Sequence, residues 1–153
     1  MRTGTIALRL CLLLATAACG SPPGATAPAS PSNTLSGTPG PTGVRAACAG
    51  VVPGEPDEIE IEARDDAFST DLITGPRDCQ PFVLIFTNHD PILHNVGIST
   101  EELGQGEYLL FGEKIEGPET IRYEVAGIPA GDYYFVCTPH WQSMNGRLIV
   151  SAD

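Results

Sequence analysis

Near its C-terminus the chain carries Cys137-Thr138-Pro139-His140-Trp141-Gln142-Ser143-Met144-Asn145-Gly146, a stretch that lies between two apolar runs. Its side chains offer a thiolate from Cys137, an imidazole from His140 and a thioether from Met144. We expect Cys137 to end a strand, and a tight turn at Pro139, whose ring fixes one backbone torsion, to return His140 toward the same ion. The stretch therefore predicts a loop that supplies three ligands to one metal.

A fourth ligand is expected on another loop, and His94 meets this expectation. It lies in Asp90-Pro91-Ile92-Leu93-His94-Asn95-Val96, just before an apolar run that can form a neighbouring strand. Two imidazoles, one thiolate and a weak, long axial methionine define the trigonal copper site used for electron transfer. Each side chain alone is more often structural, but their joint spacing favours a site. The sequence predicts one copper ion bound by His94, Cys137, His140 and Met144.

These motifs resemble those of the cupredoxins, the type 1 blue copper proteins of the plastocyanin and amicyanin kind. The resemblance covers the chain from Glu58 to Ser151 and rests on His94-Asn95, the Cys-x-x-His-x-x-x-Met loop and the segments at 82–88 and 129–135. It implies a Greek-key β-sandwich or barrel. The spacing between the last two ligands lies between those of amicyanin and plastocyanin, so the axial bond is the one to test first.

The resemblance also implies roles for residues beside the ligands. The backbone amide of Asn95 is expected to donate a hydrogen bond to the Cys137 sulfur, and the Asn95 side chain to bind near Thr138. The outer edge of His140 is the expected exit for the electron. An apolar docking surface is expected around that edge, formed by Trp141, Pro91 and Pro139. A tryptophan at this position would equally suit a packed core.

Short apolar and alternating segments, separated by glycine and proline turns and with no convincing long helix, predict an all-β fold, an antiparallel sandwich or barrel. Residues 59–63 alternate apolar with acidic side chains, as in a strand with one buried face. Residues 82–86 have no polar position, which predicts a strand buried on both faces. A turn is expected at 75–78, and irregular structure with one helical turn near Glu101 at 100–117. Further strands are expected at 70–73, 96–98, 121–125, 133–137 and 148–150.

The N-terminal segment predicts export. The apolar run from Ile6 to Ala18 is shorter than the roughly 18 residues of a membrane-spanning helix, so residues 1–18 are interpreted as a signal peptide. Small residues before Cys19 resemble a bacterial lipobox, so we expect Cys19 to carry lipid and to anchor the protein to the outer face of the cytoplasmic membrane. The alternative is a simple secretory signal and a soluble secreted or periplasmic protein.

The remaining sequence divides into a linker and one domain. Residues 19–54 are rich in Ser, Pro, Gly, Thr and Ala and predict a flexible linker that builds no core. Residues 55–153 are expected to form the copper domain. Of the five cysteines, Cys11 leaves with the signal peptide. An even remainder in an oxidising setting predicts a disulfide between Cys48 and Cys79, with two free thiols as the alternative.

Other metal and enzyme classes fit these residues less well. Zinc accepts nitrogen and sulfur ligands, but structural zinc sites avoid a thioether, so Met144 favours copper. Residues 138–143 lack the second cysteine and the carboxylate of a binuclear copper centre, and three histidines are too few for a multicopper oxidase. No third group is specified to orient a Cys137–His140 nucleophile pair, so we expect no enzyme. His89 lies in a polar turn and is interpreted as a surface residue.

The preferred function is an electron carrier that cycles between Cu(II) and Cu(I), because soft sulfur favours Cu(I) while imidazole serves both states. The alternative is an extracytoplasmic copper-binding or delivery protein. Copper binds the thiolate form of cysteine, so affinity should fall in acid.

Charge narrows the possible partners. All nineteen acidic residues lie from Glu55 onward, against five basic residues in the same segment. Nucleic-acid binding is therefore disfavoured. We expect a monomer that is steered toward a basic redox partner, such as a cytochrome or a membrane oxidase or reductase complex. The alternative is that the acids only keep the protein soluble.

Overall fold

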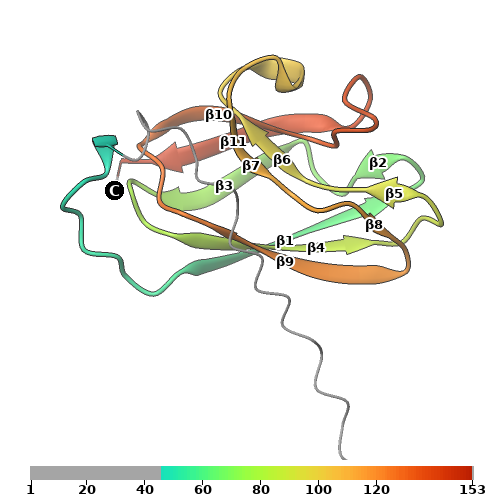
Figure 1. The fold of residues 1–153 in the computed structure, drawn as a ribbon, viewed down its shortest axis with the longest axis horizontal. Coiled ribbons are helices and arrows are strands. Elements are labelled where there is room, and N and C mark those ends of the chain that lie inside the picture. Colours follow the sequence, from blue (N-terminus) through green and yellow to red (C-terminus); the bar gives the residue numbers. More distant parts are fainter. Residues whose placement is uncertain (1–45, 153) are drawn as a thin grey trace, which may run out of the picture. The chain divides into compact units, whose positions relative to one another are not determined.

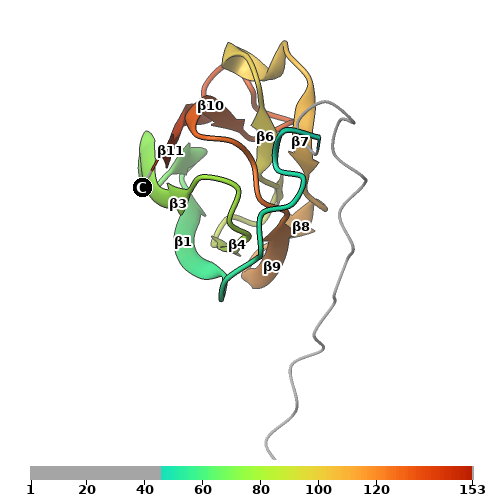
Figure 2. The ribbon, with the colours of Figure 1, turned by 90° about the vertical axis from the view of Figure 1, so that its left-hand side faces the viewer.

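The computed structural model describes residues 46–152, and within this range the chain forms eleven strands and one short 3-10 helix (Figure 1). The first sheet has the order β2-β1-β4-β9 and the second has the order β3-β11-β10-β6-β7. Viewed from the end, strands β1, β4 and β9 lie opposite β10, β11 and β6 (Figure 2). The expected all-β sandwich is therefore confirmed.

Three sheets account for these strands. The first sheet consists of β1 (Asp57–Arg64), β2 (Ala67–Phe68), β4 (Phe82–Asn88) and β9 (Glu119–Val125). The second consists of β3 (Leu72–Arg77), β6 (Gly97–Ser99), β7 (Tyr108–Phe111), β10 (Gly131–Val136) and β11 (Asn145–Ser151). A small two-stranded sheet consists of β5 (Leu93–His94) and β8 (Ile115–Glu116).

The alternation of apolar and polar residues explains which side chains of the first sheet are buried. In β1 the apolar residues Ile61 and Ala63 are buried and their acidic neighbours are exposed, and β9 repeats this pattern. Strand β4 lies between β1 and β9 and is almost wholly buried, as its unbroken apolar sequence predicts. Strand β4 pairs with β9 in antiparallel and with β1 in parallel orientation. The parallel pairing is possible because the chain crosses to the second sheet and forms β3 there between β1 and β4.

The expected turn at 75–78 is displaced. Strand β3 runs through Gly75 and Pro76 to Arg77, and the turn follows at Asp78 and Cys79. Because β3 is an edge strand beside β11, the missing N–H of Pro76 is tolerated there. Gly75, with φ of +129°, absorbs the register shift between the two strands.

The segment 100–117 contains more regular structure than its sequence suggests. The expected helical turn is present as the 3-10 helix Glu102–Gly104. Two strands, β7 and β8, were missed by the sequence prediction of irregular structure. Strand β7 is an edge strand that pairs only with β6, and its sequence Tyr108-Leu109-Leu110-Phe111 shows no alternation from which a strand could be recognised.

The core lies between the two sheets. Its largest fully buried side chains include Phe82, Phe86 and Phe135, and each contributes about 1.5–3 kcal/mol by burial. Phe68 packs edge-on against Phe135, with ring centroids 5.3 Å apart, and so joins β2 to the opposite sheet. Cys137 belongs to the same cluster of buried residues. The loop that begins at Cys137 is thus fixed directly to the core.

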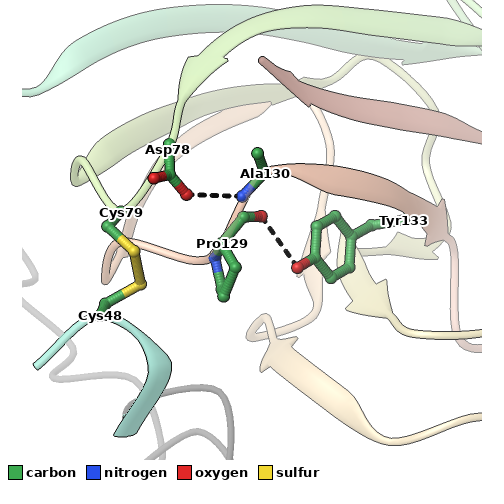
Figure 3. Close-up of a disulfide and its surroundings, with 6 residues drawn as sticks. All are labelled: Cys48, Asp78, Cys79, Pro129, Ala130 and Tyr133. Carbon is green, nitrogen blue, oxygen red and sulfur yellow. Dashed lines mark hydrogen bonds between the residues drawn. A yellow bond between two sulfur atoms is a disulfide. The ribbon is translucent and has the colours of Figure 1, made fainter. Parts of the chain in front are cut away.

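The predicted disulfide between Cys48 and Cys79 is confirmed, with an S–S distance of 2.06 Å (Figure 3). Nearby, the backbone N–H of Ala130 donates to Asp78, and the Tyr133 hydroxyl donates to the carbonyl of Pro129. Strand β4 begins just after this disulfide and ends near the loop that carries His94. The disulfide and the candidate site therefore lie at opposite ends of the sandwich (Figure 1).

Several expectations fall outside the described residues: the signal peptide at 1–18, lipidation of Cys19 and the linker up to residue 45. Among residues 46–152, no helix has the length and apolar character needed to cross a membrane.

Candidate metal centre

The structure brings three of the four candidate ligands together. His94 ends β5, Cys137 directly follows β10, and His140 lies in the next turn of the loop. Nδ1 of His94 lies 3.4 Å from the Cys137 sulfur and 3.1 Å from Nδ1 of His140, and the sulfur lies 3.6 Å from Nδ1 of His140. His94 and Cys137 are fully buried, and His140 is partly exposed. Three ligand atoms therefore face one point beneath the surface.

The loop is closed by backbone hydrogen bonds. The N–H of His140 donates to the carbonyl of Cys137, and the N–H of Met144 donates to the carbonyl of His140. The N–H of Cys137 donates to the carbonyl of Met144 at 2.9 Å, which brings the end of the loop back beside its start. Met144 is fully buried in the same cluster as Cys137. The backbone of the fourth candidate ligand thus lies beside Cys137 and His140.

Asn95 joins the two ligand-bearing loops. Its side-chain oxygen accepts hydrogen bonds from the N–H of Thr138 at 2.9 Å and from the Thr138 hydroxyl at 3.0 Å. Its side-chain nitrogen donates to the carbonyl of Gly112 at 2.7 Å. Burial raises the pKa of the Cys137 thiol above its ordinary value, while the backbone N–H groups of Asn95 and His140 lower it. The side-chain contact with Thr138 that the resemblance implied for Asn95 is present.

The separations fit one transition-metal ion. Ligand atoms about 2.0–2.3 Å from an ion, with angles of about 100–120° between them, are separated by about 3.1–3.8 Å. The three measured separations, 3.1, 3.4 and 3.6 Å, lie in this range. A thiolate and two imidazoles are donors that copper accepts, and the buried thioether of Met144 adds a soft neighbour.

Comparison with known protein families agrees with this geometry. Residues 55–151 match the family described as copper binding proteins, plastocyanin/azurin family. The chain belongs to this family. It is therefore a cupredoxin, and the resemblance that its motifs carry is confirmed. None of the curated proteins compared with the chain matches it significantly.

Solved cupredoxin structures share the fold. Auracyanin A, a "blue" copper protein from Chloroflexus aurantiacus, is 22% identical, with a TM-score of 0.56 over 63% of this chain and 99% of that one. Auracyanin from Roseiflexus castenholzii is 17% identical, with a TM-score of 0.54 over 63% and 98%. At these identities the likeness concerns the fold alone.

Sequence reasoning missed the partner of the second nitrogen of His94. Nε2 lies 3.1 Å from a carboxylate oxygen of Asp90, which accepts backbone hydrogen bonds from Asp65 and Asp66 at 2.9 and 3.1 Å. Burial alone would raise the pKa of Asp90, but these two backbone bonds and His94 outweigh it, and the pKa lies below its ordinary value. Asp90 is therefore a carboxylate at neutral pH. Its position four residues before His94 in an Asp-Pro turn was the available signal.

Exposed apolar residues lie on both ligand-bearing loops. Trp141 is 40% exposed and is thus a surface residue of this cupredoxin, not part of the core. Pro91 and Pro139 are also exposed, as is Leu93, which sequence reasoning did not single out. Pro139 and Trp141 flank His140, the partly exposed candidate ligand, in the sequence of its loop, whereas Pro91 and Leu93 belong to the loop of His94.

His89 lies apart from the metal centre. Its Nε2 is 3.1 Å from a carboxylate oxygen of Glu62 on β1, and it belongs to neither cluster of potential ligands among the described residues. The structure thus agrees with its interpretation as a surface residue.

Proposed function

We propose that this cupredoxin carries single electrons at one type 1 copper ion held by His94, Cys137, His140 and Met144. The observation that carries the proposal is the convergence of two imidazole nitrogens and the Cys137 sulfur within 3.1–3.6 Å of one another. Copper bound there would supply a Cu(II)/Cu(I) couple. The buried thioether of Met144 suits the weak axial position of such a site.

The residues around the ligands favour electron transfer over substrate chemistry. Asn95 and the backbone bonds of the Cys137 loop hold the ligands in place, so a change of charge requires little movement of the protein. His94 and Cys137 are closed off from water, while His140 is partly exposed beside Trp141. The edge of the His140 ring is accordingly the proposed route for the electron, and the role is that of a carrier and not of an enzyme.

An optical spectrum of the copper-loaded chain tests this proposal. We expect an intense blue band that disappears on reduction and returns on oxidation. Cys137→Ser should abolish the band, whereas His89→Ala, the matched control, should leave it intact because His89 contacts Glu62 instead. A colourless chain that readily gives up Cu(I) would support copper delivery, and a blue band in Cys137→Ser would refute the ligand assignment.

The proposed partner is a redox protein with a basic surface, such as a cytochrome or a membrane oxidase or reductase complex. The segment from Glu55 onward carries nineteen acidic and five basic residues, which favours such a partner. Asp65 and Asp66 are exposed near His94, so part of this charge lies close to the metal centre. The rate of electron transfer to a basic cytochrome should fall as salt is added, and a rate that is independent of salt would contradict this choice.

The proposed location is the outer face of the cytoplasmic membrane, with the domain as a monomer tethered by lipid on Cys19. Support comes from the sequence, in which an apolar run and small residues precede that cysteine. Cys19→Ala should move the protein from the membrane fraction to the soluble exported fraction. Membrane association that persists in this variant would count against the lipid anchor.

A further inference from the structure

The imidazole of His94 has two nitrogens with different surroundings. Nδ1 faces the Cys137 sulfur and the other imidazole, at 3.4 and 3.1 Å. Nε2 faces away from this point and lies 3.1 Å from Oδ2 of Asp90. When Nδ1 serves as the ligand, Nε2 keeps its proton and donates it to the carboxylate.

The Asp90 carboxylate is itself held in place. Oδ1 accepts the backbone N–H of Asp65 at 2.9 Å, and Oδ2 accepts that of Asp66 at 3.1 Å. Both donor residues have positive φ angles, 54° and 57°, which residues other than glycine rarely adopt. This backbone conformation directs the two successive N–H groups toward one anion. The backbone N–H of Asp90 donates to the buried side chain of Asn88. The turn between β1 and β2 therefore fixes this carboxylate from a segment far away in sequence.

Burial gives the charge of Asp90 an effect that an exposed acid lacks. Its side chain is only 13% exposed, whereas that of Asp66, whose carboxylate lies 3.8 Å from Nε2 of His94, is 63% exposed. Charges that water does not screen act more strongly on their neighbours. A fixed negative charge near a metal stabilises the dication more than the monocation, and a carboxylate acceptor increases the basicity of the ligand imidazole.

We propose that Asp90 is a positioning residue for the copper site, which sets the orientation of His94 and lowers the reduction potential by favouring Cu(II) over Cu(I). This inference rests on the proposed function. The competing interpretation is that Asp90 only anchors the β1–β2 turn through the two backbone N–H groups. The two interpretations differ in whether removal of the charge changes the metal or only the fold.

The test is the reduction potential of the copper-loaded full chain with Asp90→Asn. The amide keeps the size and one acceptor oxygen but removes the charge. We expect the affinity for Cu(I) relative to Cu(II) to rise at least tenfold, a potential increase of about 59 mV or more for one electron, with the blue band retained. Asp65→Asn is the matched control, since it removes an exposed charge from the same turn and should leave the potential unchanged.

An unchanged potential in Asp90→Asn, with a lower stability to urea, would overturn the proposal and leave Asp90 as a turn anchor. A wild-type chain without a reversible one-electron couple would instead contradict the proposed function. In that case the positioning role of Asp90 is tested separately, by NMR observation of the proton on Nε2 of His94 in the chain loaded with Cu(I) or Zn(II). Exchange of this proton with water should be at least tenfold faster in Asp90→Ala than in wild type, and equal rates would refute the positioning role.

Discussion

Replacement of Asn95 by alanine tests whether the two ligand-bearing loops are held together by one amide side chain. The substitution leaves the backbone of residue 95 in place, so only the side-chain bonds are lost. These are the bonds to the N–H and hydroxyl of Thr138 and to the carbonyl of Gly112. The fully buried position gives water little access to replace them.

The magnitude follows from the groups left without a partner. Each buried backbone group that loses its hydrogen bond costs about 1–3 kcal/mol. The two backbone groups, on Thr138 and Gly112, therefore predict a loss of about 2–6 kcal/mol in the free energy of unfolding, a large share of the about 5–15 kcal/mol of a typical domain. Thr138→Val, the matched control, removes only the hydroxyl bond and should cost about 0.5–1.5 kcal/mol.

Urea unfolding of the metal-free chain measures this difference without interference from copper. We expect Asn95→Ala to unfold at a markedly lower urea concentration than Thr138→Val, with an unchanged dependence of the unfolding free energy on urea. If Asn95→Ala lost no more than its control, the link between the loops would have to lie in backbone packing and not in this side chain. The reasoning from unpaired groups would then be refuted.

Three further predictions concern other parts of the molecule. Cys48→Ser/Cys79→Ser should lower the free energy of unfolding by about 3–4 kcal/mol, from the 31-residue separation of the cysteines, without loss of the blue band; a loss below about 1 kcal/mol would contradict this. Burial raises the pKa of Tyr123 well above its ordinary value of 10.0. The unfolded chain therefore loses this proton first, and stability should fall above about pH 10 by up to about 1.4 kcal/mol per pH unit; urea unfolding of Tyr123→Phe should show a weaker decline. Met144→Leu conserves volume in the core and should keep the blue band but change the reduction potential, and an unchanged potential would make Met144 a core residue only.

Local patterns predicted much of this structure because they depend on few residues. The alternation in β1 and the unbroken apolar run of β4 each follow from one segment and its burial. The turn expected at Gly75 and Pro76 was wrong because edge strands accept proline, and a position at the edge of a sheet is not visible in a local window.

The site was predictable in its ligands and not in their surroundings. His94, Cys137 and His140 were singled out by residue type and spacing, and the structure brings them together; their binding of copper together with Met144 stays a prediction. Asp90 was not singled out, and its position four residues before His94 was the one local signal for it. Its role depends on backbone donors 24 and 25 residues away, whose unusual φ angles have no clear signature in the sequence.

The disulfide at the end of the sandwich remote from the copper site also determines how a pulling force is transmitted through the domain. A pulling force applied to the chain before Cys48 passes through the covalent bond to Cys79 as well as through residues 49–78. Strand β1, which lies inside this closed loop, is therefore spared much of the load. If the domain were pulled from its N-terminal side while a partner held the surface around His140, the force would act along β4 first. Strand β1 and the Asp65–Asp66 turn would separate from the sheet only afterwards.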